Sequence, residues 1–242
     1  MSRGAAVVIG AGPGLGMSIA HRFGREGFAV ELVSRTDTRH ARYLTELAED
    51  GITARAHAVD AGDRTRMRTT LDDIAERHGG IGLLYYGPAA MDPSAFPVPI
   101  TETDSDGVRA MMDTAYAAID IAQAVLPGMI ARGDGGLLVA GGLSAVVPMP
   151  ALGSLAVTSG ALRNYVLTLN AGLAEHGVYA GTLTIGGLIE RGDIYAYATD
   201  HPEVFGGIGS RTLNPDEVAE TAWQMYVKRD RAEAVFDVIT PG

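Results

Sequence analysis

A glycine-rich turn near the N-terminus is the segment whose residue types and spacing most directly indicate chemistry. The run Ala5–Ile9 is apolar and contains β-branched residues. Four glycines follow within seven positions, at Gly10, Gly12, Gly14 and Gly16. Leu15, Ile19 and Phe23 then recur at helical spacing. A buried strand, a tight turn and a helix N-terminus in this order can bind a phosphate, because glycines let the backbone approach it and free N–H groups attract it.

The spacing of these glycines is G-x-x-x-G-x-G, at Gly10, Gly14 and Gly16. Leu15 occupies the last glycine of the commoner G-x-G-x-x-G pattern, which therefore fails here. A glycine turn alone is also found as an ordinary strand-to-helix connection. Its position ahead of a chain that keeps alternating strands and helices favours a nucleotide site.

That alternation runs along the whole sequence and predicts the fold. Strands are predicted at residues 5–9, 29–34, 53–59, 81–86, 137–140, 179–185 and 233–239. Helices are predicted at about 15–26, 38–49, 64–78, 105–130, 151–175 and 215–227. Asp63 and Asn214 are predicted helix caps. The sequence therefore predicts one α/β domain over residues 1–242, a doubly wound Rossmann-type parallel sheet with helices on both faces. Ligands of such sheets bind beyond the C-terminal ends of the strands.

Composition excludes several classes of protein. The chain has no cysteine, which excludes disulfides, cysteine nucleophiles and thiolate metal sites. Its six histidines are scattered without metal-ligand spacing, so no metal site is expected. The net charge of −10 argues against nucleic acids and anionic membranes as partners. No apolar run of about 18 residues and no signal segment are apparent, so we expect a cytoplasmic protein.

The glycine turn and the chain length resemble the short-chain dehydrogenase/reductase family, and the resemblance covers essentially the whole chain. Further marks are Asp60 after the third strand, Leu126–Met129, Ala161–Arg163 and Ile185–Ile189. The resemblance implies a seven-stranded sheet, NAD(P) bound across the strand ends and a small-molecule substrate. It also implies a homodimer or homotetramer formed through the fourth and fifth helices.

The end of the second strand indicates which nucleotide binds. NAD-dependent members of the family carry an acid there, whereas this chain has Ser34, Arg35 and Thr36. A carboxylate would repel a 2′-phosphate, but a hydroxyl and a guanidinium would hold it by charge-assisted hydrogen bonds. We therefore expect NADP(H) rather than NAD(H), with a solvated loop arginine as the alternative interpretation of Arg35.

The resemblance implies the remaining cofactor contacts. Asp60 would bind the adenine amino group with help from the backbone of Ala61, and the Ile189 backbone would meet the nicotinamide amide next to Gly187. The ribose path would be lined by Gly87, Pro88 and Ala89.

The sequence departs from the family at its acid–base residues. The one lysine is Lys228, and no tyrosine has a lysine four residues later. Alignment on residues 127–129 and 161–163 fills the positions of the family's tyrosine, lysine, serine and asparagine with Leu155, Ser159, Gly142 and Thr114. A positioned general acid is worth about 10²–10⁴ in rate. Hydride transfer is then expected with an electrophile that is already activated, such as an iminium, a quinone-like ring or a conjugated enone.

Three residues are candidates to replace the missing acid–base set: Tyr86, Ser144 and Thr114. Tyr86 and its neighbour Tyr85 end the fourth strand, where either hydroxyl can face the pocket, although packing is the alternative role. Ser144 lies two positions past the expected serine and can instead stabilise a turn. Thr114 can hold a water molecule or serve a structural role in its helix.

Residues 188–212 are predicted to form a lid over the substrate, because they mix charges, aromatic residues and glycines. Arg191 and Tyr195 are its expected substrate contacts. An oligomer-facing or solvent-exposed loop is the alternative.

Three functions are compatible with these residues. The first is an atypical NADP(H)-dependent oxidoreductase. The second is a redox-silent cyclase, isomerase or dehydratase on the same scaffold. The third is a non-catalytic nucleotide-binding partner protein. The fold cannot choose among them, because function resides in the site.

Overall fold

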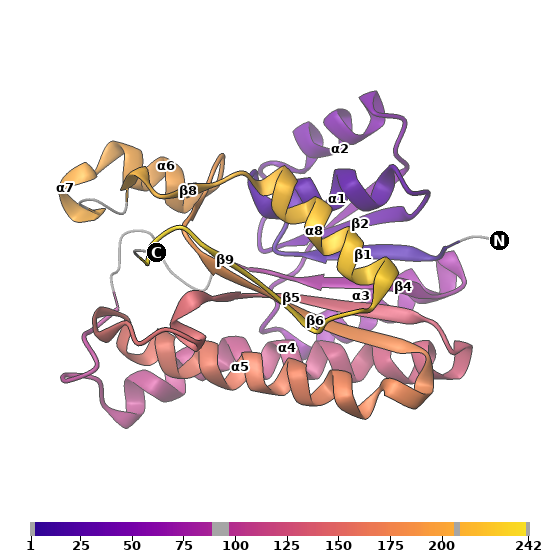
Figure 1. The fold of residues 1–242 in the computed structure, drawn as a ribbon. Helices are drawn as coiled ribbons and strands as arrows, with labels where there is room; N and C mark the ends of the chain where they lie inside the picture. Colours follow the sequence, from indigo (N-terminus) through magenta and orange to yellow (C-terminus); the bar gives the residue numbers. More distant parts are fainter. Residues whose placement is uncertain (1–2, 89–96, 206–208, 241–242) are drawn as a thin grey trace.

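Seven parallel strands form one sheet in the order β3-β2-β1-β4-β5-β6-β9 (Figure 1). The structure is a computed structural model that describes residues 3–88, 97–205 and 209–240. The strands of the sheet are β1 (Ala5–Ile9), β2 (Ala29–Ser34), β3 (Ala54–Ala58), β4 (Ile81–Tyr86), β5 (Gly135–Gly142), β6 (Val178–Gly186) and β9 (Glu233–Asp237). The predicted single-domain, doubly wound α/β fold is confirmed.

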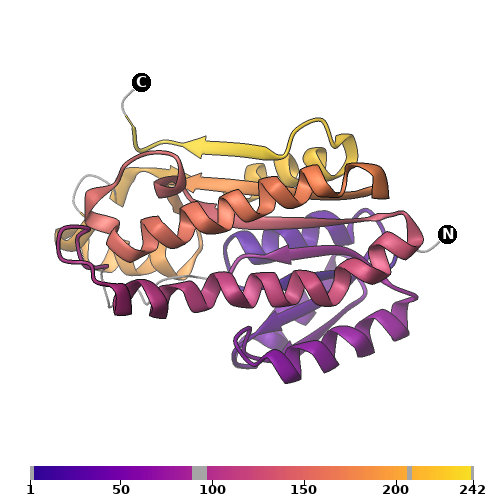
Figure 2. The same cartoon turned by 90° about the horizontal axis from the view of Figure 1, so that it is seen from below.

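Helices cover both faces of the sheet, as Figures 1 and 2 show. One face carries α1 (Leu15–Gly24), α2 (His40–Glu49) and α8 (Pro215–Lys228). The other carries α3 (Arg64–His78), α4 (Ser105–Arg132) and α5 (Gly153–Gly172). Short 3-10 helices in the described residues include η1 (Leu143–Ala145), η2 (Pro150–Leu152) and η3 (Ala174–His176). Side chains of one strand alternate between the two layers, so Val8 packs with the first set and Val7 with the second.

The predicted helix caps are confirmed. The Asp63 carboxylate accepts a hydrogen bond of 3.0 Å from the Arg66 N–H at the start of α3. Asn214 does the same for the Asp216 N–H at 2.9 Å, with Pro215 in the first turn of α8. These caps fix where the two helices begin.

The segment predicted as a lid is more ordered than its sequence indicated. It begins with β7 (Leu188–Ile189) and ends with β8 (Thr212–Leu213), and these two strands pair in parallel. Between them lie α6 (Asp193–Asp200) and α7 (Pro202–Phe205). Figure 1 shows both helices standing beside the main body at the C-terminal ends of the strands.

Helix α4 is long and apolar enough to cross a membrane by length and composition. Within the fold, however, 44% of its apolar window is buried, against α3, α5 and the strands β4 and β5. Core helices meet the same two criteria, so α4 is explained by its place on the sheet.

A buried carboxylate joins β2, β3 and α3 on the α3 side of the sheet. Glu31 in β2 is 0% exposed. It pairs with His57 of β3 and His78 of α3, each at 2.6 Å, and with Arg77 at 3.2 Å. Burial alone would raise the pKa of Glu31, but hydrogen bonds and charge from the two histidines lower it below its ordinary value. The network therefore stabilises the ionised carboxylate.

Because that pKa is lowered on folding, Glu31 stabilises the fold above its unfolded value of about 4.3 and loses this effect as the pH falls through its folded pKa. We expect Glu31→Gln to reduce the free energy of unfolding at pH 7 by about 1–3 kcal/mol. The difference between wild type and variant should shrink at pH 3. Urea denaturation at both pH values measures this, with exposed Glu76→Gln as the control. An equal difference at both pH values would contradict the assignment.

Candidate functional site

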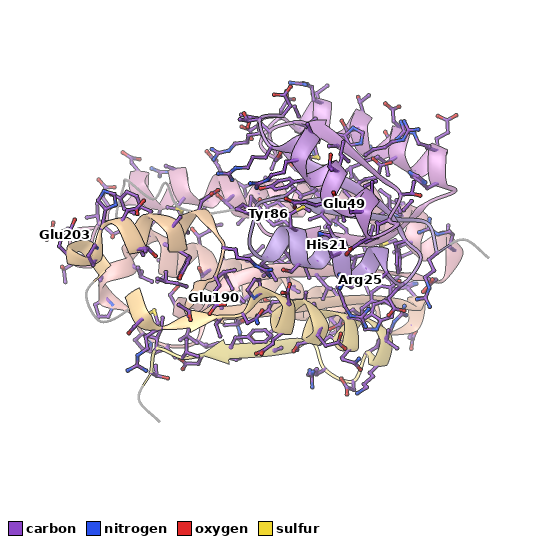
Figure 3. The ribbon with its side chains drawn as sticks, turned by 90° about the horizontal axis from the view of Figure 1, so that it is seen from above. His21, Arg25, Glu49, Tyr86, Glu190 and Glu203 are labelled. Atoms are coloured by element: carbon purple, nitrogen blue, oxygen red, sulfur yellow. The ribbon has the colours of Figure 1, made fainter. Side chains whose placement is uncertain are left out.

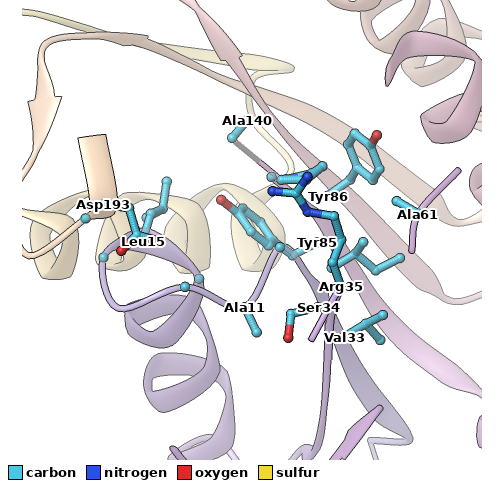
Figure 4. Close-up of a pocket in the computed structure, with 18 of the residues that line it drawn as sticks. Ala11, Leu15, Val33, Ser34, Arg35, Ala61, Tyr85, Tyr86, Ala140 and Asp193 are labelled. Carbon is cyan, nitrogen blue, oxygen red and sulfur yellow. The ribbon is translucent and has the colours of Figure 1, made fainter. Parts of the chain in front are cut away.

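The strand order reverses at β1, which has β2 on one side and β4 on the other. A cleft of about 970 Å³ opens there, at the C-terminal ends of the strands (Figure 4). Each of five neighbouring strands contributes a lining residue at its C-terminal end, and these include Ile9, Val33, Tyr86, Ala140 and Ile185. This is where ligands bind in doubly wound sheets.

The glycine turn forms the floor of the cleft, and close contacts exclude a Cβ at three of its glycines, Gly10, Gly14 and Gly16. Gly10 has φ 93°, and a Cβ there would lie 2.5 Å from the backbone of Gly87. A Cβ on Gly14 would lie 2.9 Å from Cγ2 of Ile189 and 3.1 Å from Cα of Gly192. The turn is thus packed against β4 on one side and against the start of the lid on the other.

At the end of β2, Arg35 lines the cleft (Figure 4). Within the described residues its guanidinium forms no ion pair. Ser34 also lines the cleft, and its hydroxyl donates to the Thr36 carbonyl oxygen at 2.9 Å and bonds His40 Nε2 at 2.7 Å. Ser34 therefore organises the loop. Thr36 and Thr38 of the same loop also line the cleft.

The other expected cofactor positions lie along the same cleft. Asp60 turns one carboxylate oxygen to the Gly62 N–H at 2.8 Å, which leaves its second oxygen for another donor. The remaining expected lining residues are Gly12, Leu15, Gly16, Ala61, Gly87, Pro88, Gly187 and Ile189. Ala89 lies outside the described residues. That these residues bind a nucleotide stays a prediction.

The three candidate acid–base residues are placed differently from one another. Tyr86 is buried in the interior (Figure 3), and its hydroxyl donates to the backbone carbonyl oxygen of Thr114 at 2.8 Å. Burial raises the pKa of Tyr86. The hydroxyl thus joins β4 to α4, and Thr114 itself lines the cleft. Ser144 is not among the lining residues, and its buried Oγ has no hydrogen-bond partner among the described residues.

Tyr85, one residue earlier, points toward the opposite face of the sheet. Its hydroxyl reaches Gly87, where an added Cβ would collide with it, and the residue lines the cleft. Within the described chain no hydrogen bond is found for this hydroxyl. Burial raises the pKa of Tyr85 and keeps it protonated. Of the two tyrosines, Tyr85 is the one whose hydroxyl has no hydrogen-bond partner among the described residues.

The lid contacts expected from sequence are corrected. The Arg191 guanidinium donates to Ser18 Oγ at 3.0 Å and to Asp216 Oδ1 at 2.7 Å, so it fixes the root of the lid to α1 and α8. Arg191 does this with φ 65°, a left-handed backbone that only a well-held non-glycine residue adopts. Neither Arg191 nor Tyr195 lines the cleft, whereas Asp193 and Ile194 do.

Sequence reasoning missed an ion pair at this cleft. Arg39, in the loop after β2, donates from both terminal nitrogens to both carboxylate oxygens of Asp193, each at 2.8 Å. Both residues line the cleft. The spacing of Arg39 four residues after Arg35 was the available signal, but its partner lies 154 residues away. Asp113 of α4 is a further lining residue that was missed.

No group of three or more His, Asp or Glu side chains suited to a metal ion occurs in the described ranges. The features that remain are a glycine cradle, an unpaired cation and a cleft at the strand switch point. They fit a dinucleotide better than a metal centre.

The family model for short chain dehydrogenases matches residues 4–190. The chain therefore belongs to the short-chain dehydrogenase/reductase family of oxidoreductases. Dehydrogenase/reductase SDR family member 4 of Bos taurus is 28% identical over 184 residues, which are 75% of this chain and 64% of that protein. The very-long-chain 3-oxoacyl-CoA reductase of Neurospora crassa is 28% identical over 72% of this chain and 52% of its own. The match thus spans less than two thirds of either relative.

Solved structures share the fold along nearly the whole chain. A metagenomic short-chain oxidoreductase in complex with NADP matches with a TM-score of 0.77 and 19% identity, over 99% of both chains. A gluconate 5-dehydrogenase from Burkholderia cenocepacia in complex with NADP and tartrate matches with a TM-score of 0.79 and 21% identity, over 98% of this chain and 95% of that one. At these identities the likeness shows the fold.

Substitutions at Gly12 and Gly10 should distinguish an effect on nucleotide binding from an effect on folding. A Cβ on Gly12 would meet only the Gly10 carbonyl oxygen, at 3.9 Å. We expect Gly12→Ala to change the free energy of unfolding by less than about 1 kcal/mol but to weaken nucleotide binding, because the methyl group projects into the phosphate path. Gly10→Ala should destabilise the fold by more, since its φ and contacts exclude a side chain. Thermal unfolding and calorimetric titration measure both effects. Unaltered nucleotide affinity in Gly12→Ala would argue against the phosphate path.

Proposed function

We propose that this protein is an NADP(H)-dependent oxidoreductase that acts on an activated small-molecule carbonyl, imine or enone. The observation that carries the proposal is the guanidinium of Arg35, which forms no ion pair within the described residues, in a cleft whose floor is the glycine turn. The close contacts at Gly10 and Gly14 leave a backbone cradle without side chains, which fits a pyrophosphate. Arg35, with Thr36 and Thr38 beside it, fits a 2′-phosphate.

The substrate class follows from the residues at the acid–base positions. Leu155, Ser159 and Gly142 are absent from the cleft lining, and none carries a charge. When bound, a reduced nicotinamide supplies a hydride. Without a charged acid–base pair, the rate loss of about 10²–10⁴ is smallest for an electrophile that needs little help from a proton. An iminium, a quinone-like ring and a conjugated enone meet that condition.

Tyr85 is the proposed hydrogen-bond donor to the substrate. Its hydroxyl lies at Gly87 on the cleft wall, whereas the Tyr86 hydroxyl is engaged by the Thr114 carbonyl oxygen. The earlier candidate Ser144 is set aside because it does not line the cleft. Thr114 remains a cleft residue that can position a water molecule.

Association into a homodimer or homotetramer and a cytoplasmic location remain proposals. The outward residues Tyr116, Ile130 and Val157 of α4 and α5 are 53%, 38% and 42% exposed. Such apolar side chains support an interface at these helices.

The phosphate assignment is tested by titrating the chain with NADPH and NADH in a calorimeter. We expect tighter binding of NADPH, and Arg35→Ala should weaken it about tenfold or more while changing NADH binding little. Arg55→Ala is the matched control, because Arg55 is an exposed cation on the neighbouring strand that does not line the cleft. Failure to bind either nucleotide would overturn the proposed function.

The proposed role of Tyr85 is tested by following NADPH oxidation with iminium, quinone and enone acceptors. Tyr85→Phe should lower kcat by about 10²-fold, without weakening NADPH binding. Tyr86→Phe should leave kcat nearly unchanged and lower the free energy of unfolding by about 1 kcal/mol, because its hydroxyl bonds only the backbone. A normal rate in Tyr85→Phe would remove that residue from the mechanism. Turnover supported equally by NADP⁺ and NADPH, without net oxidation, would favour the redox-silent alternative.

A further inference from the structure

The ion pair between Arg39 and Asp193 crosses the mouth of the cleft. Arg39 belongs to the loop that carries Arg35, and it directly precedes α2. Asp193 is the first residue of α6 in the lid. Gly192, which precedes it, packs against Gly14 of the glycine turn. In Figure 4, Asp193 and Arg35 are labelled on opposite sides of the glycine turn. The pair therefore connects the lid to the loop at the end of β2.

The pair uses the edge of the Arg39 guanidinium that carries the two terminal nitrogens. Nη1 of Arg39 donates to Oδ2 of Asp193 and Nη2 donates to Oδ1, each at 2.8 Å. A phosphate binds a guanidinium through the same parallel pair of hydrogen bonds. The Asp193 carboxylate thus occupies the edge of Arg39 that an anionic ligand in the cleft would use.

The Arg39–Asp193 ion pair can also be opened at little cost in stability. The two side chains are 46% and 51% exposed, and ion pairs at such positions contribute little to stability. The root of the lid is held independently, by the β7–β8 pairing and by Arg191 with Ser18 and Asp216. Opening the pair therefore releases the first turn of α6 without releasing the root.

We propose that the 2′-phosphate of NADP(H) competes with Asp193 for Arg39, which makes this ion pair a determinant of nucleotide specificity and couples the phosphate to the lid. A phosphate with its nearly double negative charge cannot share the Arg39 edge with a carboxylate. Arg39, once released, adds a second cation to Arg35. A nucleotide without the 2′-phosphate leaves the pair closed. The inference rests on the proposed NADP(H) binding and assigns Asp193 a role in it.

The test is a double-mutant cycle on nucleotide affinity, measured by calorimetric titration with NADPH and with NADH. Asp193→Asn should bind NADPH about three- to fivefold tighter than wild type, because Arg39 no longer has a competing carboxylate. Arg39→Gln should bind NADPH about tenfold weaker. Neither change should alter NADH affinity appreciably. In the double variant the gain from Asp193→Asn should disappear.

Two controls match the charge changes. Arg42→Gln removes an exposed cation on α2 that pairs with Glu46, and Asp200→Asn removes an exposed acid at the other end of α6. Neither residue lines the cleft, so neither change should affect the ratio of the two affinities. Thermal unfolding verifies that all variants are folded.

The outcomes separate this inference from the function on which it rests. Equal weakening of NADPH and NADH binding in Asp193→Asn would show a clasp that holds the lid over either nucleotide, and it would overturn the competition. An unchanged NADPH affinity in that variant would overturn it as well, while leaving the proposed function standing. A wild-type chain that binds neither nucleotide would overturn both.

Discussion

The approach of Gly10 to Gly87 is the contact on which the remaining structure depends. At this point β1 ends between β2 and β4, and the backbone must turn into α1 without blocking the opening between the two neighbouring strands. The Gly10 N–H bonds the Val33 carbonyl oxygen at 3.0 Å, and the Gly87 N–H bonds the Ile9 carbonyl oxygen at 2.9 Å. Only a residue without a Cβ permits both contacts at φ 93°. The position of the helix N-terminus and the opening of the cleft follow from this close packing.

Charge is distributed unevenly around that cleft. The floor offers backbone and apolar groups, the β2 loop contributes the cations Arg35 and Arg39, and acids approach from the β3 loop and the lid as Asp60 and Asp193. Asp113 of α4 is a third lining acid, and Arg39 is paired with Asp193, so Arg35 is the lining cation that forms no ion pair among the described residues. Arg35 therefore attracts an anionic group to the end of the cleft at the β2 loop.

Much of the fold could be predicted from sequence, because hydrophobic runs and caps are local signals. The strands Ala5–Ile9, Ala29–Ser34 and Ile81–Tyr86 begin and end where predicted. The orientation of Tyr85 and Tyr86 could not be derived, since all six residues of β4 are buried and the pattern has no period that distinguishes the two faces. Arg191 was predicted to contact a substrate. Its partners Ser18 and Asp216 could not be identified, because they lie far away in sequence. Likewise, strands of two residues such as β7 and β8 carry no periodic signal.

The β7–β8 pairing has a consequence for how this chain can diverge. Leu188 and Glu190 donate their N–H groups to the carbonyl oxygens of Arg211 and Leu213, at 2.8 and 3.0 Å, so the two ends of the lid are fastened to each other rather than only to the sheet. A segment closed in this way can change in length or sequence between its two fixed ends. Because the entropy of closing a loop grows slowly with its length, insertions and deletions between residues 190 and 211 have little effect on the seven-stranded sheet. Sequence change that alters the ligand preference can accumulate there while the scaffold stays constant.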